Sequence, residues 1–113
     1  MNHAFEARVS VIDDGAVVTL SGTVDRAAKQ ELEAAYDKAS SSSGRVLLDF
    51  RGVDYINSTG IAVIVGVLAM ARAENREVGA FGLTEHYREV FNITRLADFM
   101  TIYEDETAAV AAG

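Results

Sequence analysis

Two neighbouring hydroxyl side chains, Ser58 and Thr59, stand in the middle of the chain. Such a hydroxyl can act as a nucleophile when a base activates it, or it can accept a phosphoryl group from a kinase. No Gly-x-Ser-x-Gly turn surrounds Ser58. Neither His3, close to the terminus, nor His86, on the polar face of a predicted helix, is an evident base for it. The two hydroxyls are therefore better suited to modification than to catalysis.

The remaining residues offer no other reaction centre. The chain has no cysteine and only two histidines, too few and too far apart for a metal site. No glycine-rich loop ends in Lys-Ser or Lys-Thr, as a phosphate-binding loop requires. The acidic clusters Asp13-Asp14 and Glu104-Asp105-Glu106 have the positions of turn and helix-cap residues. We therefore expect no enzyme activity, no metal and no cofactor.

The charge of the chain argues against a nucleic-acid partner. The formal net charge is −7 at pH 7, and Lys29 and Lys38 belong to no basic cluster that could contact DNA or an anionic bilayer. The N-terminal residues do not resemble a signal peptide. The longest apolar run, Ile61–Ala71, is far shorter than the ~20 residues of a membrane-spanning helix. We expect a cytoplasmic protein without membrane insertion, which the absence of cysteine fits.

The hydrophobic pattern up to residue 44 predicts two strands and a helix. Alternation from Phe5 to Val11 indicates a half-buried strand, and the turn Asp13-Asp14-Gly15 leads into a second strand that ends near Ser21-Gly22. A helix follows from Arg26, with Asp25 at its N-cap position and a serine-rich turn after it. The apolar face of this helix comprises Ala28, Leu32, Ala35, Tyr36 and Ala39.

The second part of the chain alternates strands and helices. Val46–Phe50 is nearly all apolar, as in a central strand covered on both faces, and Arg51–Asn57 is predicted to be a loop. A helix beginning at Ser58 comes next, because its length, its cap residues and its polar continuation outweigh its β-branched content. The further elements are a strand over Val78–Leu83, a helix capped by Thr84, a strand over Phe99–Tyr103 and a helix over Glu104–Ala112.

This succession gives the order β-β-α-β-α-β-α-β-α, which predicts an α/β fold with a mixed sheet and helices packed on it. The chain has 113 residues, and half of them are apolar. It can therefore bury a hydrophobic core, and we expect residues 1–113 to form a single domain.

The predicted helix over Ile61–Ala71 is apolar around almost its whole circumference. A helix that lies on a sheet buries only one face, so the outer face needs a cover. A neighbouring helix is the simpler cover. The alternative is that part of this helix forms a docking surface or the contact of a weak homodimer.

Three segments together resemble the sequence pattern of STAS domains. Residues 47–61, Leu-Leu-Asp-Phe-Arg-Gly-Val-Asp-Tyr-Ile-Asn-Ser-Thr-Gly-Ile, are similar to the family's signature, in which a strand and a loop lead to an Asp-Ser-Ser/Thr-Gly motif at a helix start. Gly22–Asp25 resembles the Gly-x-x-Asp segment before the first helix, and Val90–Phe99 resembles the C-terminal helix-loop-strand pattern. The resemblance covers almost the whole chain and implies the STAS fold, with a mixed, mostly parallel sheet.

The resemblance is to STAS proteins of the anti-sigma factor antagonist type. These bind an anti-sigma factor when unphosphorylated and so free a sigma factor. A serine kinase, often the anti-sigma factor itself, phosphorylates the first hydroxyl residue of the motif, and a serine phosphatase reverses the reaction. The resemblance implies that Ser58 is the phosphorylation site, ahead of Thr59. It also implies a partner-binding surface that comprises Asp25, Asn57, Ser58, Thr59, Gly60 and Ile61.

One position departs from the family pattern, because the aspartate that precedes the serine is Asn57 here. The exchange keeps a capping oxygen but removes a charge that a kinase could read. A phosphate on Ser58 would add about −1.5 to −2 charges at the start of a helix, where the helix dipole favours an anion. The modification would then mainly change the surface that a partner meets.

The same residues also have purely structural interpretations. Asn57 and Ser58 could be only helix caps, each worth about 1 kcal/mol. Asp25 could likewise be a cap, and Gly60 could ease a tight turn. Asp54 has the character of a solvated loop carboxylate.

Two other functions remain open at this point. One is a STAS scaffold or adaptor without a sigma factor, in a signalling complex or a lipid-transport system; Asn57 favours this divergence, whereas an intact Ser58 favours the switch. The other is a nucleotide- or ligand-binding regulator that uses the helix start at Ser58 as an anion site.

Overall fold

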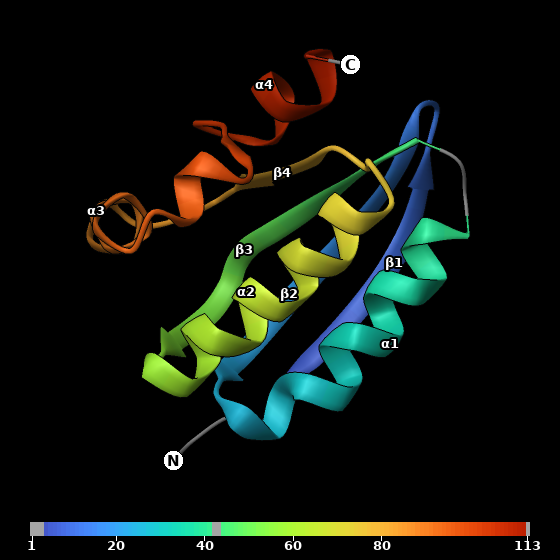
Figure 1. Ribbon diagram of the computed structural model, residues 1–113. Helices are drawn as coiled ribbons and strands as arrows, with labels where there is room; N and C mark the ends of the chain where they lie inside the picture. The colour runs from blue at the N-terminus through green and yellow to red at the C-terminus, as the bar shows by residue number, and fades with distance from the viewer. Residues whose placement is uncertain (1–3, 42–43, 113) are drawn as a thin grey trace.

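The computed structural model describes residues 4–41 and 44–112, in which helices pack on both faces of a five-stranded sheet (Figure 1). The strands are β1 (Glu6–Ile12), β2 (Gly15–Val24), β3 (Arg45–Ile56), β4 (Val78–Phe81) and β5 (Thr101–Ile102), and they lie in this order across the sheet. β1 and β2 are antiparallel, and the other neighbouring pairs are parallel. The predicted mixed, mostly parallel sheet is confirmed.

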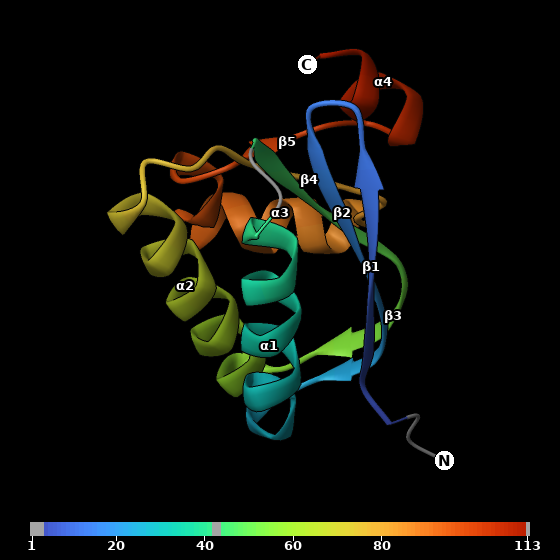
Figure 2. The ribbon, with the colours of Figure 1, turned by 90° about the vertical axis from the view of Figure 1, so that its right-hand side faces the viewer.

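The helices are α1 (Lys29–Ser40), α2 (Ser58–Ala73), α3 (Glu85–Ile93) and α4 (Glu106–Ala111). α1 and α2 lie side by side over one face of the sheet, and α4 packs on the other face (Figure 2). Two short 3₁₀ turns, Arg26–Ala28 and Leu96–Asp98, precede α1 and β5. The predicted order of strands and helices is also confirmed. In the described ranges, no helix is long and apolar enough to cross a membrane.

Alternate residues of the central strands build two hydrophobic clusters, because successive side chains of a strand point to opposite faces. The larger cluster lies under α1 and α2 and includes Val18, Leu48 and Tyr36, which are fully buried. α3 joins this cluster through Phe91, whose ring meets that of Phe50 edge to face at 5.6 Å. On the opposite face, α4 inserts Ala109 against a small cluster of Val17, Leu47 and Phe81.

The apolar helix α2 is covered over most of its circumference. Its residues Val63, Ile64, Val67, Leu68 and Ala71 are buried, and Ile61 and Met70 pack partly against the core. The neighbouring helix α1 supplies part of the cover, as the simpler prediction required. An exposed stripe remains, formed by Ala62, Val65 and Ala69.

The prediction of a loop over Arg51–Asn57 is wrong, because β3 continues to Ile56 and β2 continues to Val24. The two strands pair in parallel through two register shifts, between Thr19 and Ser21 and between Gly22 and Thr23. Such bulges add residues without ending the ladder, and they break the alternation that reveals a strand in a sequence. Asp54 therefore lies on an exposed strand position rather than in a loop.

Other element boundaries differ by a few residues. β4 ends at Phe81 rather than Leu83, and β5 covers only Thr101–Ile102. α4 begins at Glu106, since Asp105 is its N-cap. Val11 was expected on the buried side of the first strand but is 71% exposed, at the hairpin end of β1.

Candidate functional site

The candidate residues gather where β2 and β3 end. Val24 and Ile56 are paired at the end of this parallel ladder, and the Asn57 N–H donates to the Val24 carbonyl at 3.3 Å. The carboxyl ends of parallel strands meet at one edge of a sheet, so the segments that follow them become neighbours. Figure 2 shows the starts of α1 and α2 together at this edge. The structure thus brings Asp25 and the 57–61 segment to one end of the molecule.

Asn57 is the N-cap of α2 and organises the first turn of the helix. Its backbone is extended, and its Oδ1 accepts hydrogen bonds from the Gly60 N–H at 2.9 Å and from the Thr59 hydroxyl at 2.7 Å. The cap satisfies one of the N–H groups that a helix start leaves without a partner. Of the two predicted cap residues, only Asn57 has this role, because Ser58 is already the first helical residue.

The Thr59 hydroxyl ties the two loops together. Besides donating to Asn57, its Oγ1 accepts a hydrogen bond from the Arg26 N–H at 3.0 Å. Asp25 lies in the same loop and caps the 3₁₀ turn rather than α1 itself, since its Oδ1 accepts from the Ala27 N–H at 2.9 Å. The half-buried Thr59 side chain therefore connects the loop after β2 to the start of α2 through its hydrogen bonds.

Gly60 has a structural reason to be glycine. A Cβ at this position would lie 2.0 Å from the carbonyl oxygen of Val24, which is far inside contact distance. The residue is buried, and its close approach to β2 holds the helix start against the strand end. Ile61 is half-buried and packs partly against the core, so it presents only part of its side chain at the surface.

Ser58 differs from these neighbours. It is exposed on the first turn of α2, and its hydroxyl makes no hydrogen bond within the described ranges. The adjacent residues hold the backbone of the turn, Asn57 as the N-cap and Thr59 through its hydrogen bond with the Arg26 N–H. The site is therefore a fixed scaffold that displays one unengaged hydroxyl.

Two aromatic residues near this scaffold were missed by the sequence argument. The Tyr87 hydroxyl of α3 accepts a hydrogen bond from the Ile56 N–H at 2.9 Å and so holds the residue before Asn57. Tyr87 packs partly against the core, and the need of a packed tyrosine hydroxyl for a partner was the signal available. Tyr55 is 56% exposed next to the end of β3, and it could be placed on a face only once β3 was known to extend that far.

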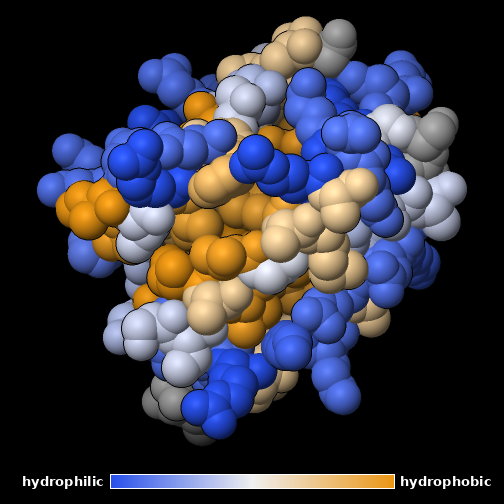
Figure 3. Space-filling view, viewed as in Figure 1, coloured by the Kyte–Doolittle hydropathy of each residue, from blue (hydrophilic) through white to orange (hydrophobic). Residues whose placement is uncertain are grey.

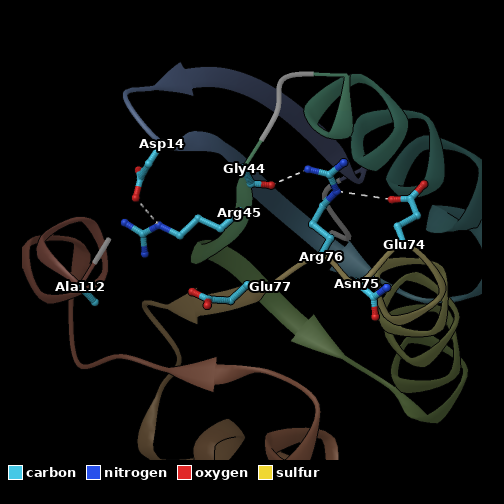
Figure 4. Close-up of a pocket in the computed structure, with 8 residues that line it drawn as sticks. All are labelled: Asp14, Gly44, Arg45, Glu74, Asn75, Arg76, Glu77 and Ala112. Carbon is cyan, nitrogen blue, oxygen red and sulfur yellow. Dashed lines mark hydrogen bonds and ion pairs between the residues drawn. The ribbon is translucent and has the colours of Figure 1, made fainter.

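A cavity of about 480 Å³ lies at the other end of the strands, and Figure 4 shows its lining. Arg45 is buried there; its guanidinium donates to the Asp14 carboxylate at 2.9 Å and to the carbonyls of Ala109 and Val110 at 2.6 and 2.9 Å. Arg76 donates to the carbonyls of Gly44 and Ser40. These side chains join chain segments to one another, so the cavity is a structural junction. Within the described ranges, no cluster of His, Asp or Glu residues could hold a metal ion.

Comparison with protein families decides the relationship of this chain. The family model described as "Mlab, STAS domain" matches residues 7–102, which covers all five strands but the first residue of β1, as well as α1 to α3. The chain belongs to the STAS domain family. STAS proteins of the anti-sigma factor antagonist type are regulatory binding proteins rather than enzymes, in agreement with the prediction of no catalytic activity.

Two relatives of this STAS chain come from bacteria. The chain is 32% identical to BtrV of Bordetella bronchiseptica over 102 residues, which cover 89% of this chain and 88% of BtrV. It is 30% identical to the anti-sigma-B factor antagonist of Listeria monocytogenes over 86 residues, which cover 75% of each protein. The match therefore extends over most of the length of both relatives.

Solved structures show the same fold. An anti-sigma factor antagonist from Mycobacterium paratuberculosis superposes with a TM-score of 0.78 at 20% identity, over 96% of this chain and 93% of that protein. The phosphorylated form of SpoIIAA, a Bacillus cell fate determinant, superposes with a TM-score of 0.69 at 20% identity, over 97% of this chain and 100% of SpoIIAA. The predicted STAS fold is confirmed.

Proposed function

We propose that this chain is an anti-sigma factor antagonist that binds an anti-sigma factor when Ser58 is unphosphorylated, and that phosphorylation of Ser58 breaks the complex. A serine kinase, which can be the anti-sigma factor itself, adds the phosphate, and a serine phosphatase removes it. The observation that carries the proposal is the exposed Ser58 hydroxyl without a hydrogen bond in the described ranges, between the Asn57 cap and the hydrogen-bonded Thr59 side chain. The name of the Listeria relative, an anti-sigma-B factor antagonist, supports the sigma-factor part.

Ser58 is a better acceptor than Thr59 for a physical reason. The Thr59 oxygen already donates to Asn57 and accepts from Arg26, so a kinase that modified it would have to break both contacts and separate the two loops. Modification of Ser58 breaks no hydrogen bond of the described structure and leaves the cap in place. The difference between the two residues favours Ser58 as the single switch position.

The phosphate acts on the partner rather than on the fold. Ser58 begins a helix of 16 residues, whose first N–H groups and dipole favour a negative charge. The domain therefore accepts the modification, whereas a closely fitting partner meets a new charge of about −1.5 to −2. Unless the partner has a cation at that point, such a charge in an interface costs several kcal/mol.

The remaining residues of the predicted partner-binding surface contribute to partner binding in different ways. Asn57, Thr59 and Gly60 position the helix start, and we propose that they act on the partner mainly through the placement of Ser58. Tyr55, two residues before Asn57 in the chain, has an exposed aromatic ring of the kind that often dominates an interface. An anti-sigma factor is an intracellular partner, so the proposal retains the predicted cytoplasmic location.

The test uses two baits that differ at one atom group. Ser58→Ala keeps the surface without an acceptor, and Ser58→Asp adds a permanent charge. Each is used to recover partners from the native cell extract, and the recovered partner is then purified. We expect an ATP-binding serine kinase that binds wild type and Ser58→Ala alike, binds Ser58→Asp about 100-fold more weakly, and phosphorylates wild type at Ser58 only.

The matched control is Thr107→Asp, which adds the same charge at an exposed position of α4, at the other end of the molecule. It should bind the partner like wild type. Equal affinity of Ser58→Ala and Ser58→Asp would contradict the switch. Recovery of membrane-transport subunits, with Ser58 unmodified throughout, would establish the scaffold function in its place.

A further inference from the structure

The exposed stripe of α2 leads away from Ser58. From this residue, Ala62, Val65, Ala69 and Arg72 follow at intervals of three or four, so they share one face of the helix, and all are exposed. Val65 is 48% exposed, although the surrounding helix is strongly apolar. The surface around Ser58 therefore continues along α2 as a row of small and apolar side chains.

The stripe ends in a groove of about 250 Å³ between α2 and the segment after α3. Val65, Leu68 and Ala69 line it from α2, and Leu96 and Phe99 line it from the other side. Phe99 is 51% exposed, and Ile93, beside the lining residue Thr94, is 72% exposed. Figure 3 shows the apolar surface that gathers over α2, with hydrophilic residues around it. Clustered exposed apolar side chains of this kind mark interaction sites more often than isolated ones do.

One cation stands at the end of the groove. Arg72 is the only charged residue of the lining, and its guanidinium lies 5.3 Å from the centre of the Phe99 ring. No ion pair or hydrogen bond of its side chain exists within the described ranges, whereas the nearby Arg95 is paired with Asp98 at 2.8 Å. On a chain of net charge −7, an unpaired arginine beside an apolar floor is complementary to an apolar group with a carboxylate next to it.

We propose that this groove receives a large apolar side chain of the anti-sigma factor, with a neighbouring Asp or Glu of the same partner on Arg72. The identity of the partner rests on the proposed function. The groove adds a second contact region, which begins at Val65 and ends at Phe99. The two regions together form one docking surface along α2.

The distance between the two regions has a consequence for the switch. Fourteen residues separate Ser58 from Arg72, which corresponds to about 21 Å along a helix. This is more than two Debye lengths at physiological salt, so a phosphate on Ser58 is screened from Arg72. The contribution of the Arg72 contact to affinity should therefore be the same with and without phosphate on Ser58, so the two contributions add.

The chemistry of the groove can be tested on the purified chain alone, with 4-phenylbutyrate as the probe and 4-phenylbutanol as its neutral counterpart. We expect saturable amide shifts in ¹H–¹⁵N spectra at Val65, Ala69 and Phe99, with the carboxylate binding about 5-fold more tightly than the alcohol. Arg72→Gln should remove this preference, and Lys38→Gln, at an exposed position of α1, should keep it. Shifts elsewhere, or equal affinity for the two probes, would overturn the groove's assignment.

The occupant is tested with the purified anti-sigma factor and the variant Ala69→Asp, which places a carboxylate at the exposed wall of the groove. We expect Ala69→Asp to weaken binding about 10-fold, both in the otherwise wild-type chain and in the chain that also carries Ser58→Asp. Ala34→Asp, at an exposed position of α1, should leave binding unchanged. If Ser58 switches binding but Ala69→Asp has no effect, the groove proposal fails and the proposed function stands. If the probe binds but no anti-sigma factor does, the partner is wrong, and dilution-dependent dimers abolished by Ala69→Asp would assign the groove to a second copy.

Discussion

The polar groups at the two ends of the central strands differ in how they are hydrogen-bonded. Where the strands begin, the side chains of Arg45 and Arg76 are bound to carboxylates or to carbonyls of distant segments (Figure 4). Where β2 and β3 end, the polar groups around Ser58 are bound to one another, and the Ser58 hydroxyl has no partner in the described ranges. The first end joins distant segments of the chain to one another, and the second is a scaffold with one available hydroxyl group.

This difference explains why the larger cavity is a poor guide to function here. The cavity of about 480 Å³ lies at the junction, where its arginines already have structural partners. Buried polar groups need hydrogen bonds to be stable, so a satisfied arginine in a cavity is what folding alone requires. An exposed hydroxyl on a well-ordered helix start contributes little to folding, and its availability is what a modifying enzyme requires. The comparison therefore predicts stability effects at one end and partner effects at the other.

The largest stability effect should come from Arg45→Met. The substitution removes the donors of the Ala109 and Val110 carbonyls and the partner of Asp14, while Met keeps much of the side-chain volume. Because the Asp14 side chain is 42% exposed and can be hydrated, we expect a loss of about 3 kcal/mol, at the lower end for a broken buried ion pair. Urea unfolding measures this loss.

The control for Arg45 is Arg8→Met, since the Arg8 side chain is 82% exposed and lies 4.0 Å from Glu6. Its effect should stay within about 0.5 kcal/mol. At a temperature where the Arg45 variant is folded, its affinity for the anti-sigma factor should equal that of wild type. A change in affinity without a change in fold would show that the two ends are coupled.

At the end that holds Ser58, Gly60→Ala should be the most damaging small substitution. The new Cβ would meet the Val24 carbonyl at 2.0 Å, so α2 must move away from the end of β2. We expect a loss of about 2 kcal/mol, typical of overpacking, together with weaker partner binding because Ser58 is displaced. Unfolding and binding are measured on the same preparation.

Gly66→Ala is the matched control in the same helix. A Cβ at Gly66 meets no atom within 4 Å, so alanine should stabilise α2 by about 0.5–1 kcal/mol. If both substitutions destabilise equally, the cost at Gly60 belongs to the helix and not to the contact with Val24. The pair thus separates the packing of the site from the general behaviour of α2.

The sequence was sufficient for the order of the elements and for the place of the site. Periodicity revealed the helices and most strands, and the Asn57 cap and the hydroxyl motif placed the start of α2 correctly. What it could not reveal was set by partners distant in the chain. The bulges that extend β3 to Ile56 depend on β2, and the engagement of the Thr59 hydroxyl depends on the Arg26 N–H.

The same limit applies to the difference between Ser58 and Thr59. Adjacent hydroxyls have the same chemistry in a sequence, and the resemblance alone favoured Ser58. The geometry adds an independent reason, because Thr59 points into the contact between two loops while Ser58 faces solvent. Arg72 is a similar case, since its missing partner in the described ranges becomes meaningful only beside Phe99.

A pH effect should come from the junction end, through Tyr36 and Glu74. The buried Tyr36 hydroxyl donates to Glu74 Oε1 at 2.7 Å, and burial together with this hydrogen bond raises the pKa of Tyr36 to about 12. In the unfolded chain the tyrosine ionises near pH 10. The stabilisation is therefore complete below pH 10 and is lost as the pH rises towards 12, by about 1 kcal/mol between pH 9 and pH 11.

Tyr36→Phe should abolish this loss of stability at alkaline pH. The difference in free energy of unfolding between wild type and the variant, measured with urea, should therefore shrink above pH 10. The same hydrogen bond is the main cause that lowers the pKa of Glu74. The stability that this hydrogen bond gives to the folded state is present above the usual glutamate pKa. It is lost as the pH falls through the lower pKa that Glu74 has in the folded protein, so the variant should also lose less stability in acid. Parallel pH profiles of the two proteins would contradict the assignment.

The smallest expected effect is that of Asn57→Asp, which restores the residue of the family pattern. The carboxylate can accept from the Gly60 N–H and the Thr59 hydroxyl as the amide oxygen does, and its charge faces the positive end of the α2 dipole. We expect a gain of about 0.5 kcal/mol at neutral pH and low salt, which disappears in 1 M salt. Asn57→Ala, which loses the cap, should instead cost about 1 kcal/mol. Because neither substitution removes the Ser58 hydroxyl, the phosphorylation rate of Asn57→Asp then reports whether the kinase reads charge beside its target, and an unchanged rate would mean that the asparagine serves the helix alone.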